Sequence, residues 1–193
     1  MEKNIIIIGI LLLAIGVGIG YLFPRSNLMT PTGTHLQSDG SRMSQNIDQY
    51  FISQMIPHHE GAIEMAKIAL KRSKRPEILS LAKGVIEAQE RENHDMRAWY
   101  EQWFGAAPSS SGMGMMHMDG MKGDLDILTS VPPEGFDREF IEQMIPHHEM
   151  AIMMAQMLLA ATERGEMKTL ANNIIVSQSS EIQMMRGWLK AWY

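Results

Sequence analysis

The apolar residues of the chain follow two patterns. Residues 4–23 form a run without a charged side chain. Further along, apolar residues recur every three or four positions, which is the spacing of one face of an α-helix. This spacing continues through residues 48–70, 77–104, 137–159 and 166–193. This part of the chain shows no alternating strand pattern, so the sequence predicts an all-α fold.

The second pair of predicted helices repeats the first pair. The heptapeptide Gln54–Glu60 (QMIPHHE) recurs unchanged at Gln143–Glu149, 89 positions later. The same offset continues in both directions without an insertion or deletion, and a fixed period of this kind is typical of a duplicated structural unit. Further identical pairs are Phe51/Phe140, Ala62/Ala151, Met65/Met154, Leu81/Leu170, Gln89/Gln178, Glu92/Glu181, Met96/Met185, Arg97/Arg186, Trp99/Trp188 and Trp103/Trp192.

Two helices cannot bury their apolar faces alone, whereas two copies packed about a pseudo-twofold axis can. We therefore expect an antiparallel four-helix bundle built from two repeated helical hairpins. Asp48 is the expected N-cap of the first helix, and Pro57 should kink that helix or start a new one. The expected parts are a signal anchor or signal peptide at 1–23, a flexible tether at 24–44, the first hairpin at 45–104, a Met-rich linker at 105–133 and the second hairpin at 134–193.

The apolar run at 4–23 is long enough to cross a bilayer as a helix, and it is preceded by Lys3. The apolar region of a secretory signal has the same character. The run ends in the bulky residues Tyr21–Pro24 without a small-x-small cleavage site, which favours an uncleaved membrane anchor helix over a cleaved signal. In both cases the remainder is exported, so we expect a periplasmic protein that meets the membrane through 4–23.

The composition of the chain limits the partners and the kinds of site that it can have. The net charge of −5 argues against a nucleic-acid partner, which usually requires a basic face. Without cysteine the chain cannot form a disulfide, a thiolate metal site or a redox dithiol. There are 19 methionines among the 193 residues, and core filling alone does not account for so many, because methionine specifies a core poorly.

The repeated heptapeptide places histidines near the core. When positions are advanced 100° per residue from Met55, the two adjacent histidines flank the centre of the apolar stripe. One interpretation is that carboxylates such as Glu92 and Glu181 bind these rings inside the core. The other is a ligand set, because titratable rings in a core cost stability unless something binds them. The four histidines are His58, His59, His147 and His148.

The methionines of the hairpins divide into two groups. Core filling is the leading explanation for Met55, Met65, Met144 and Met154, which recur in both repeats and lie on or beside the apolar stripe. Three others lie on the opposite face of the second repeat only, where the first repeat has Gly61, Glu64 and Ile68. These are Met150, Met153 and Met157. They form either a second apolar interface or, with Met154 beside them and His147 one turn below, a soft ligand set.

The linker carries the same kinds of ligand outside any predicted helix. Its Gly-, Ser- and Asp-rich composition offers few anchors for a core, so its methionines have no evident packing role. Thioethers select Cu(I) or its analogue Ag(I) over Zn(II), and they need no deprotonation. The absence of cysteine suits an oxidising compartment. The candidate ligands of the linker are Met113, Met115, Met116, His117, Met118 and Met121.

The repeated motif Met-x-Pro-His-His, followed by Ala-x-x-Met, resembles that of a ferritin-like helical family long labelled a domain of unknown function. The resemblance covers residues 45–193. It implies a ferritin-like bundle, periplasmic Cu(I) binding and copper tolerance. The positions that it implicates are His58, His59, Met65, His147, His148 and Met154. Only the second repeat adds methionines at 150, 153 and 157, which sets the two repeats apart.

Three functions fit these observations. The favoured one is a Cu(I) binding or delivery protein whose partners are copper ions and a copper sensor or efflux component. A membrane-tethered bundle that binds a protein through its Met-rich face is the second. The third, a ferritin-like di-metal oxidase, needs paired Glu and Glu-x-x-His motifs. Glu90 and His94 are spaced by four instead, and Ser179 and Gln183 replace them in the second repeat. We therefore expect no enzyme.

Overall fold

The computed structural model describes residues 39–108 and 125–193. Its long helices are α1 (Asp39–Arg72), α2 (Pro76–Phe104), α4 (Phe136–Ala161) and α5 (Gly165–Trp192). The described residues contain no strand, which confirms the all-α prediction. The anchor expected at 4–23 and the linker ligands between 113 and 121 lie outside the described residues. Among those described, no helix combines the length and the apolarity needed to cross a membrane.

Each hairpin is closed by a three-residue turn that the sequence stabilises locally. Arg75 is extended before Pro76, and proline is tolerated in a first helical turn because its missing N–H would have no helical partner there. The N–H of Arg75 donates to Ser73 Oγ at 3.2 Å, and the N–H of Arg164 donates to Thr162 Oγ1 at 3.2 Å. α2 ends at Phe104, and the φ of 68° at the following Gly105 is the left-handed conformation that glycine adopts without strain.

The predicted start of the first helix was wrong. α1 begins at Asp39, inside the stretch expected to be a tether, so Asp48 lies within the helix and is not its cap. Residues 39–47 lack the apolar periodicity on which the prediction relied. The helix also continues through Pro57, and α4 continues through Pro146, so neither proline starts a new helix. The alternative, a kink at Pro57, stays a prediction.

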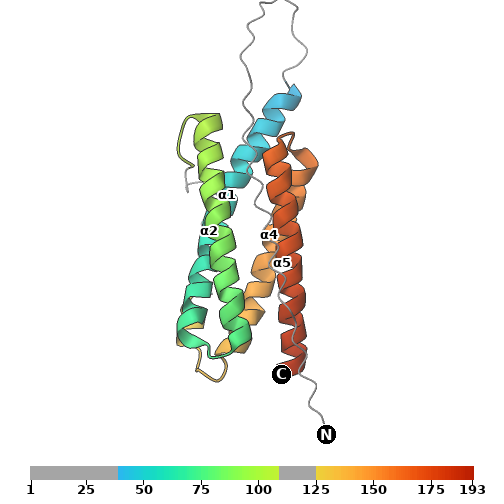
Figure 1. Cartoon of the computed structure of the whole chain (residues 1–193). Coiled ribbons are helices and arrows are strands. Elements are labelled where there is room, and N and C mark those ends of the chain that lie inside the picture. The colour runs from blue at the N-terminus through green and yellow to red at the C-terminus, as the bar shows by residue number, and fades with distance from the viewer. Residues whose placement is uncertain (1–38, 109–124) are drawn as a thin grey trace, which may run out of the picture. The chain divides into compact units, whose positions relative to one another are not determined.

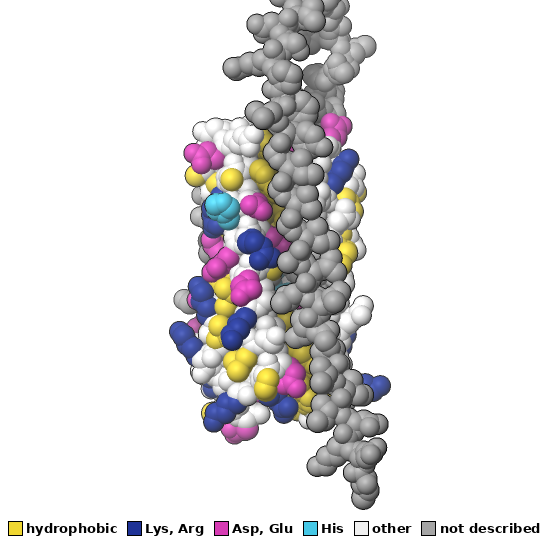
Figure 2. Space-filling model, in the orientation of Figure 1, with side chains coloured by type: hydrophobic (Ala, Val, Ile, Leu, Met, Phe, Trp, Pro, Cys, Tyr) yellow, Lys and Arg dark blue, Asp and Glu magenta, His cyan; other side chains and the backbone are white. Residues whose placement is uncertain are grey.

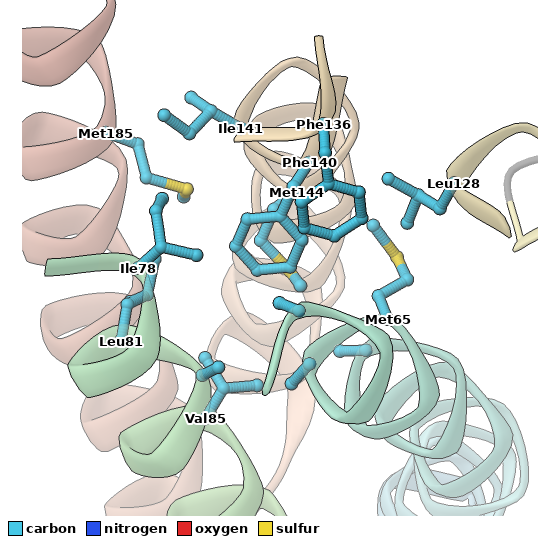
Figure 3. Packing of buried hydrophobic residues seen from close by; sticks show 14 of the residues in the cluster. Met65, Ile78, Leu81, Val85, Leu128, Phe136, Phe140, Ile141, Met144 and Met185 are labelled. Atoms are coloured by element: carbon cyan, nitrogen blue, oxygen red, sulfur yellow. The ribbon is translucent and has the colours of Figure 1, made fainter. Parts of the chain in front are cut away.

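α1 packs along α2 and α4 packs along α5, and the two hairpins meet mainly through α1 and α4 (Figure 1). The core consists of two apolar clusters. One joins the C-terminal half of α1 to the N-terminal half of α4 and includes Phe136, Phe140, Met144 and Met185 (Figure 3). The other joins the opposite halves of the same helices around Met55. α1 and α4 therefore run antiparallel.

A band of polar side chains separates the two apolar clusters halfway along the helices. We call it the polar layer. Its members come from all four long helices, and all but Glu92, Glu181 and His147 are buried. They are His58, His59, Gln89, Glu92, His147, His148, Gln178 and Glu181.

Reciprocal contacts between the repeats show the pseudo-twofold symmetry. Asp48 Oδ2 lies 3.2 Å from Arg164 Nε, and Asp137 Oδ2 lies 3.1 Å from Arg75 Nε. Each pair joins one repeat to the other. Asp137 and Arg164 are the equivalents of Asp48 and Arg75, 89 positions later. Such exchange of partners requires a twofold relation between the hairpins.

Each of these arginines also lies on a tryptophan ring. Arg164 Cζ is 4.0 Å from the centroid of the Trp103 ring, and Arg75 Cζ is 4.3 Å from that of Trp192. A guanidinium at this distance from an indole face is attracted by the ring quadrupole. The resulting Asp–Arg–Trp clusters connect the two hairpins at opposite ends of the bundle.

Residues 125–130 form a short helical segment within the stretch expected to be linker. Leu128 is fully buried against the apolar cluster that contains Phe136. The guanidinium of Arg72 donates to the carbonyls of Leu128 and Val131 and lies 4.8 Å from the centroid of the Phe136 ring. These contacts attach the chain before α4 to the end of α1.

The buried carboxyl of Asp48 should make the stability of the fold depend on pH. Burial raises the pKa of its carboxyl above the ordinary 3.8, and hydrogen bonding from Thr162 and the charge of Arg164 offset this only in part. The folded state then holds this proton more tightly than the unfolded state, so the stabilisation from Asp48 is complete below about pH 3.8 and is lost as pH rises through the folded-state pKa. An Asp48→Asn variant lacks this dependence and should gain stability relative to the wild type between pH 4 and 7. Urea unfolding across that range measures the difference in the free energy of unfolding between the two proteins. A variant that loses stability relative to the wild type as pH rises would show that the fold stabilises the charged carboxylate of Asp48.

Candidate metal centre

Two histidine–glutamate pairs occupy the polar layer. His59 Nε2 lies 2.7 Å from Glu92 Oε2, and His148 Nε2 lies 2.6 Å from Glu181 Oε2. Both imidazoles are fully buried, whereas both carboxylates are 18% exposed. The expectation that Glu92 and Glu181 bind core histidines is therefore confirmed for one histidine of each repeat.

The other two histidines meet between the repeats. The ring centroids of His58 and His147 are 3.8 Å apart, with 46° between the ring planes. The two residues are equivalent in the repeat, so their contact lies on the pseudo-twofold axis. The rings of His58 and His59 are 6.5 Å apart, as are those of His147 and His148. The fold thus brings together all four histidines that the sequence singles out.

Several buried polar atoms of this region have no hydrogen-bond partner within the described part of the chain. They include Nδ1 of His59 and His148 and the side-chain oxygens of Gln89, Asn93 and Gln178. Buried polar atoms in folded proteins are nearly always paired. Neutral nitrogen and oxygen atoms with free lone pairs fit a metal ion or another electron-pair acceptor.

The methionines of α4 lie where their helical phase predicts. Met150, Met153 and Met157 are 37%, 53% and 58% exposed, and we call them the methionine ridge. Met154 is half-buried beside it. Such exposed thioethers stabilise no core, so the ridge is available to a metal ion or to a partner.

The methionines that recur in both repeats are buried more deeply. Met55 and Met144 are fully buried, and Met65 is 2% exposed. Met65 and Met144 belong to the apolar cluster around Phe140 (Figure 3). These positions support core filling for Met55 and Met144. Met65, a position that the family resemblance implicates, lies in the same apolar surroundings.

Met184 is not among the candidate residues predicted from the sequence. This residue of α5 is 44% exposed, and Val176 on the same helix is 70% exposed. The corresponding residues of the first repeat are Asp95 and Glu87. The substitution of a charged residue by an apolar one between the repeats was a signal that could have identified both positions.

The first hairpin has an open groove lined mainly by charged side chains of α1 and α2. Acidic and basic side chains alternate over the face that α1 and α2 present (Figure 2). Within the groove, Arg97 donates to Glu60 at 2.6 Å and Lys67 donates to Glu64 at 2.8 Å. Met153 is the counterpart of Glu64, so the two repeats offer different chemistry at equivalent places. Among the described residues, no three His, Asp or Glu side chains form a group suited to a metal ion.

Comparison with solved structures finds proteins that share this fold. Three metal-bound structures of CopM superpose on it, each with 76% of this chain covered. The Cu(II)-bound form is 50% identical over 97% of that chain, with a TM-score of 0.70. The Cu(I)-bound form is 47% identical over 97% of that chain, with a TM-score of 0.68. The Ag-soaked form is 46% identical over 96% of that chain, with a TM-score of 0.67.

More distant relatives share parts of the chain. A fragment from Deinococcus radiodurans is 30% identical, with a TM-score of 0.68 and coverage of 75% of this chain and 96% of that one. The uncharacterized protein L153 of Acanthamoeba polyphaga mimivirus is 42% identical over 53 residues. That match covers 28% of this chain and 35% of the viral protein, so the chain spans about a third of that relative.

A protein-family model matches most of the chain. The domain of unknown function DUF305 matches residues 48–192, which run from within α1 to the end of α5. This chain belongs to the DUF305 family.

Proposed function

We propose that this chain is an exported copper-binding protein that sequesters or delivers Cu(I) through methionine and histidine side chains. The observation that carries the proposal is the methionine ridge, where three thioethers are exposed on one side of α4. Soft, neutral sulfur ligands favour Cu(I) and Ag(I) over harder cations. CopM, which shares about half of its aligned residues with this chain, has Cu(I)-, Cu(II)- and Ag-bound structures.

The proposed ligands fall into three groups. The first is the ridge with Met154, which is half-buried beside it. The second is the set of paired histidines of the polar layer, to which the family resemblance adds Met65. The third is the run of methionines with His117 in the linker, outside the described residues. The groups are proposed separately because each can be tested by its own variants.

The cellular setting is part of the same proposal. An N-terminal anchor at 4–23 would place the ferritin-like bundle in the periplasm, where Cu(I) exchange with a copper sensor or efflux component would contribute to copper tolerance. A chain without cysteine can bind Cu(I) in an oxidising compartment without losing ligands to disulfides.

Protein docking is a second candidate function. Met184 and Val176 add exposed apolar side chains on α5 to those that the methionine ridge presents on α4. Exposed apolar patches frequently mark interaction sites. Elemental analysis after a metal titration distinguishes the two functions, because a docking surface retains no copper.

The affinity of the chain for Cu(I) or Ag(I) relative to Zn(II) tests the proposal. The chain should bind Cu(I) or Ag(I) far more tightly than Zn(II) under reducing conditions, because thioethers contribute to the first two ions and little to the third. Competition with chromophoric chelators for each metal measures the affinities. Zn(II) binding that equals or exceeds Cu(I) binding would show that the histidines dominate and that the thioethers are not ligands.

A further inference from the structure

The two histidine–glutamate pairs share a feature that the copper proposal does not use. In each pair Nε2 of a fully buried imidazole faces a carboxylate oxygen, at 2.7 Å for His59 and 2.6 Å for His148. In each pair the other ring nitrogen, Nδ1, is buried and has no hydrogen-bond partner within the described part of the chain. The same arrangement occurs in both repeats, although other equivalent positions have diverged.

The short distance determines where the proton lies. A carboxylate is only an acceptor, so an unprotonated Nε2 would bring two lone pairs together at this separation. Nε2 therefore carries the hydrogen and donates it to the carboxylate. In a neutral imidazole the other nitrogen then holds the lone pair, because which nitrogen is protonated is set by the hydrogen bond that the ring makes.

A buried lone pair without a donor is unfavourable on its own. A cation at Nδ1 satisfies the ring, and metal-bound histidines commonly donate their other N–H to a carboxylate, which fixes the tautomer and raises the basicity of the ligand atom.

We propose that Glu92 and Glu181 are positioning residues that hold His59 and His148 as Nε2–H tautomers. Each ring thereby presents Nδ1 as a ligand atom to a soft monovalent cation, Cu(I) or Ag(I). This inference rests on the proposed copper function and adds the specific atoms that bind and the residues that orient them.

The test uses the whole 193-residue chain with Ag(I) as the probe. The variant carries Glu92→Gln and Glu181→Gln. The control carries Glu60→Gln and Glu149→Gln, which remove the same charge from the same hairpins. The control carboxylates are exposed and accept from Arg97 at 2.6 Å and from Arg186 at 2.5 Å.

Nitrogen-15 shifts of the histidine rings report the tautomer without any mutation. In the wild type, His59 and His148 should show a protonated Nε2 and a lone pair on Nδ1, and Ag(I) should shift the Nδ1 resonance of both. The Glu92→Gln, Glu181→Gln variant should lose the uniform Nε2–H tautomer and bind Ag(I) about 10- to 100-fold more weakly, which is the usual effect of removing such a carboxylate. The control variant should keep both the tautomer and the affinity.

The outcomes separate this inference from the copper proposal. A wild-type chain that binds Ag(I) without any change at Nδ1 of His59 or His148 overturns the inference and leaves the copper function standing. Wild-type affinity in the Glu92→Gln, Glu181→Gln variant overturns it as well. A wild-type chain that binds neither Ag(I) nor Cu(I) overturns both proposals.

Discussion

A variant that carries Met150→Leu, Met153→Leu and Met157→Leu is expected to bind less Cu(I) while its apo form melts almost where the wild type does. Leucine keeps the size and apolarity of methionine but has no lone pair for a metal. Volume-conserving swaps cost less than about 1.5 kcal/mol each even in a core. At 37% to 58% exposure the cost should be smaller still. Copper stoichiometry and the apo melting temperature, measured on the same preparation, test this expectation.

The matched control is the pair Met55→Leu and Met144→Leu. Both side chains are fully buried, so this change should perturb packing and lower the melting temperature while most of the copper capacity remains. Full copper capacity in the ridge variant would show that the ridge is an interface. The linker methionines would then become the better candidates for the ligands.

The Arg164→Ala change is expected to destabilise the chain by about 3 kcal/mol at neutral pH, at the lower end of the range for breaking a buried ion pair. It leaves the fully buried Asp48 without its cation and removes the contact with the Trp103 ring. For a chain of this size, a loss of this magnitude lowers the melting temperature by about 6 to 12 °C. Urea unfolding measures the free energy directly. The loss should shrink on acidification, because Asp48 can then become neutral.

The pseudo-twofold symmetry supplies the control for this variant. Arg75→Ala makes the same change at the other Asp–Arg–Trp cluster, where Asp137 is 17% exposed and Arg75 is 43% exposed. Ion pairs with this access to water contribute about 1 kcal/mol or less. Equal losses in the two variants, or a larger loss in Arg75→Ala, would contradict the account in which burial of Asp48 sets the difference.

The repeat made much of the fold predictable. Because the offset of 89 positions holds without interruption, one helical phase sufficed to place the histidines near the core and the methionine ridge outside it. The pairing of His59 with Glu92 was foreseeable because both are repeated polar residues next to apolar stripes. The period of the apolar residues indicates which side chains of a helix face the core.

Contacts between the repeats could not be predicted in the same way. The stack of His58 on His147 depends on where the pseudo-twofold axis crosses α1 and α4, which no spacing within one hairpin determines. Arg75 and Arg164 lie in the turns, outside every periodic segment, so their cross-repeat ion pairs with aspartates left no helical signal. The start of α1 was missed for a related reason, since its first turns show no apolar pattern.

Crystals of this chain soaked with Ag(I) provide the most direct test of the central claim that methionine and histidine side chains bind the metal. Silver scatters anomalously, so a difference map locates each ion without assumptions about its ligands. The account predicts peaks within bonding distance of thioether sulfurs on the methionine ridge and of imidazole nitrogens in the polar layer. Silver found only at carboxylates, with none beside a methionine sulfur or a histidine nitrogen, would contradict it.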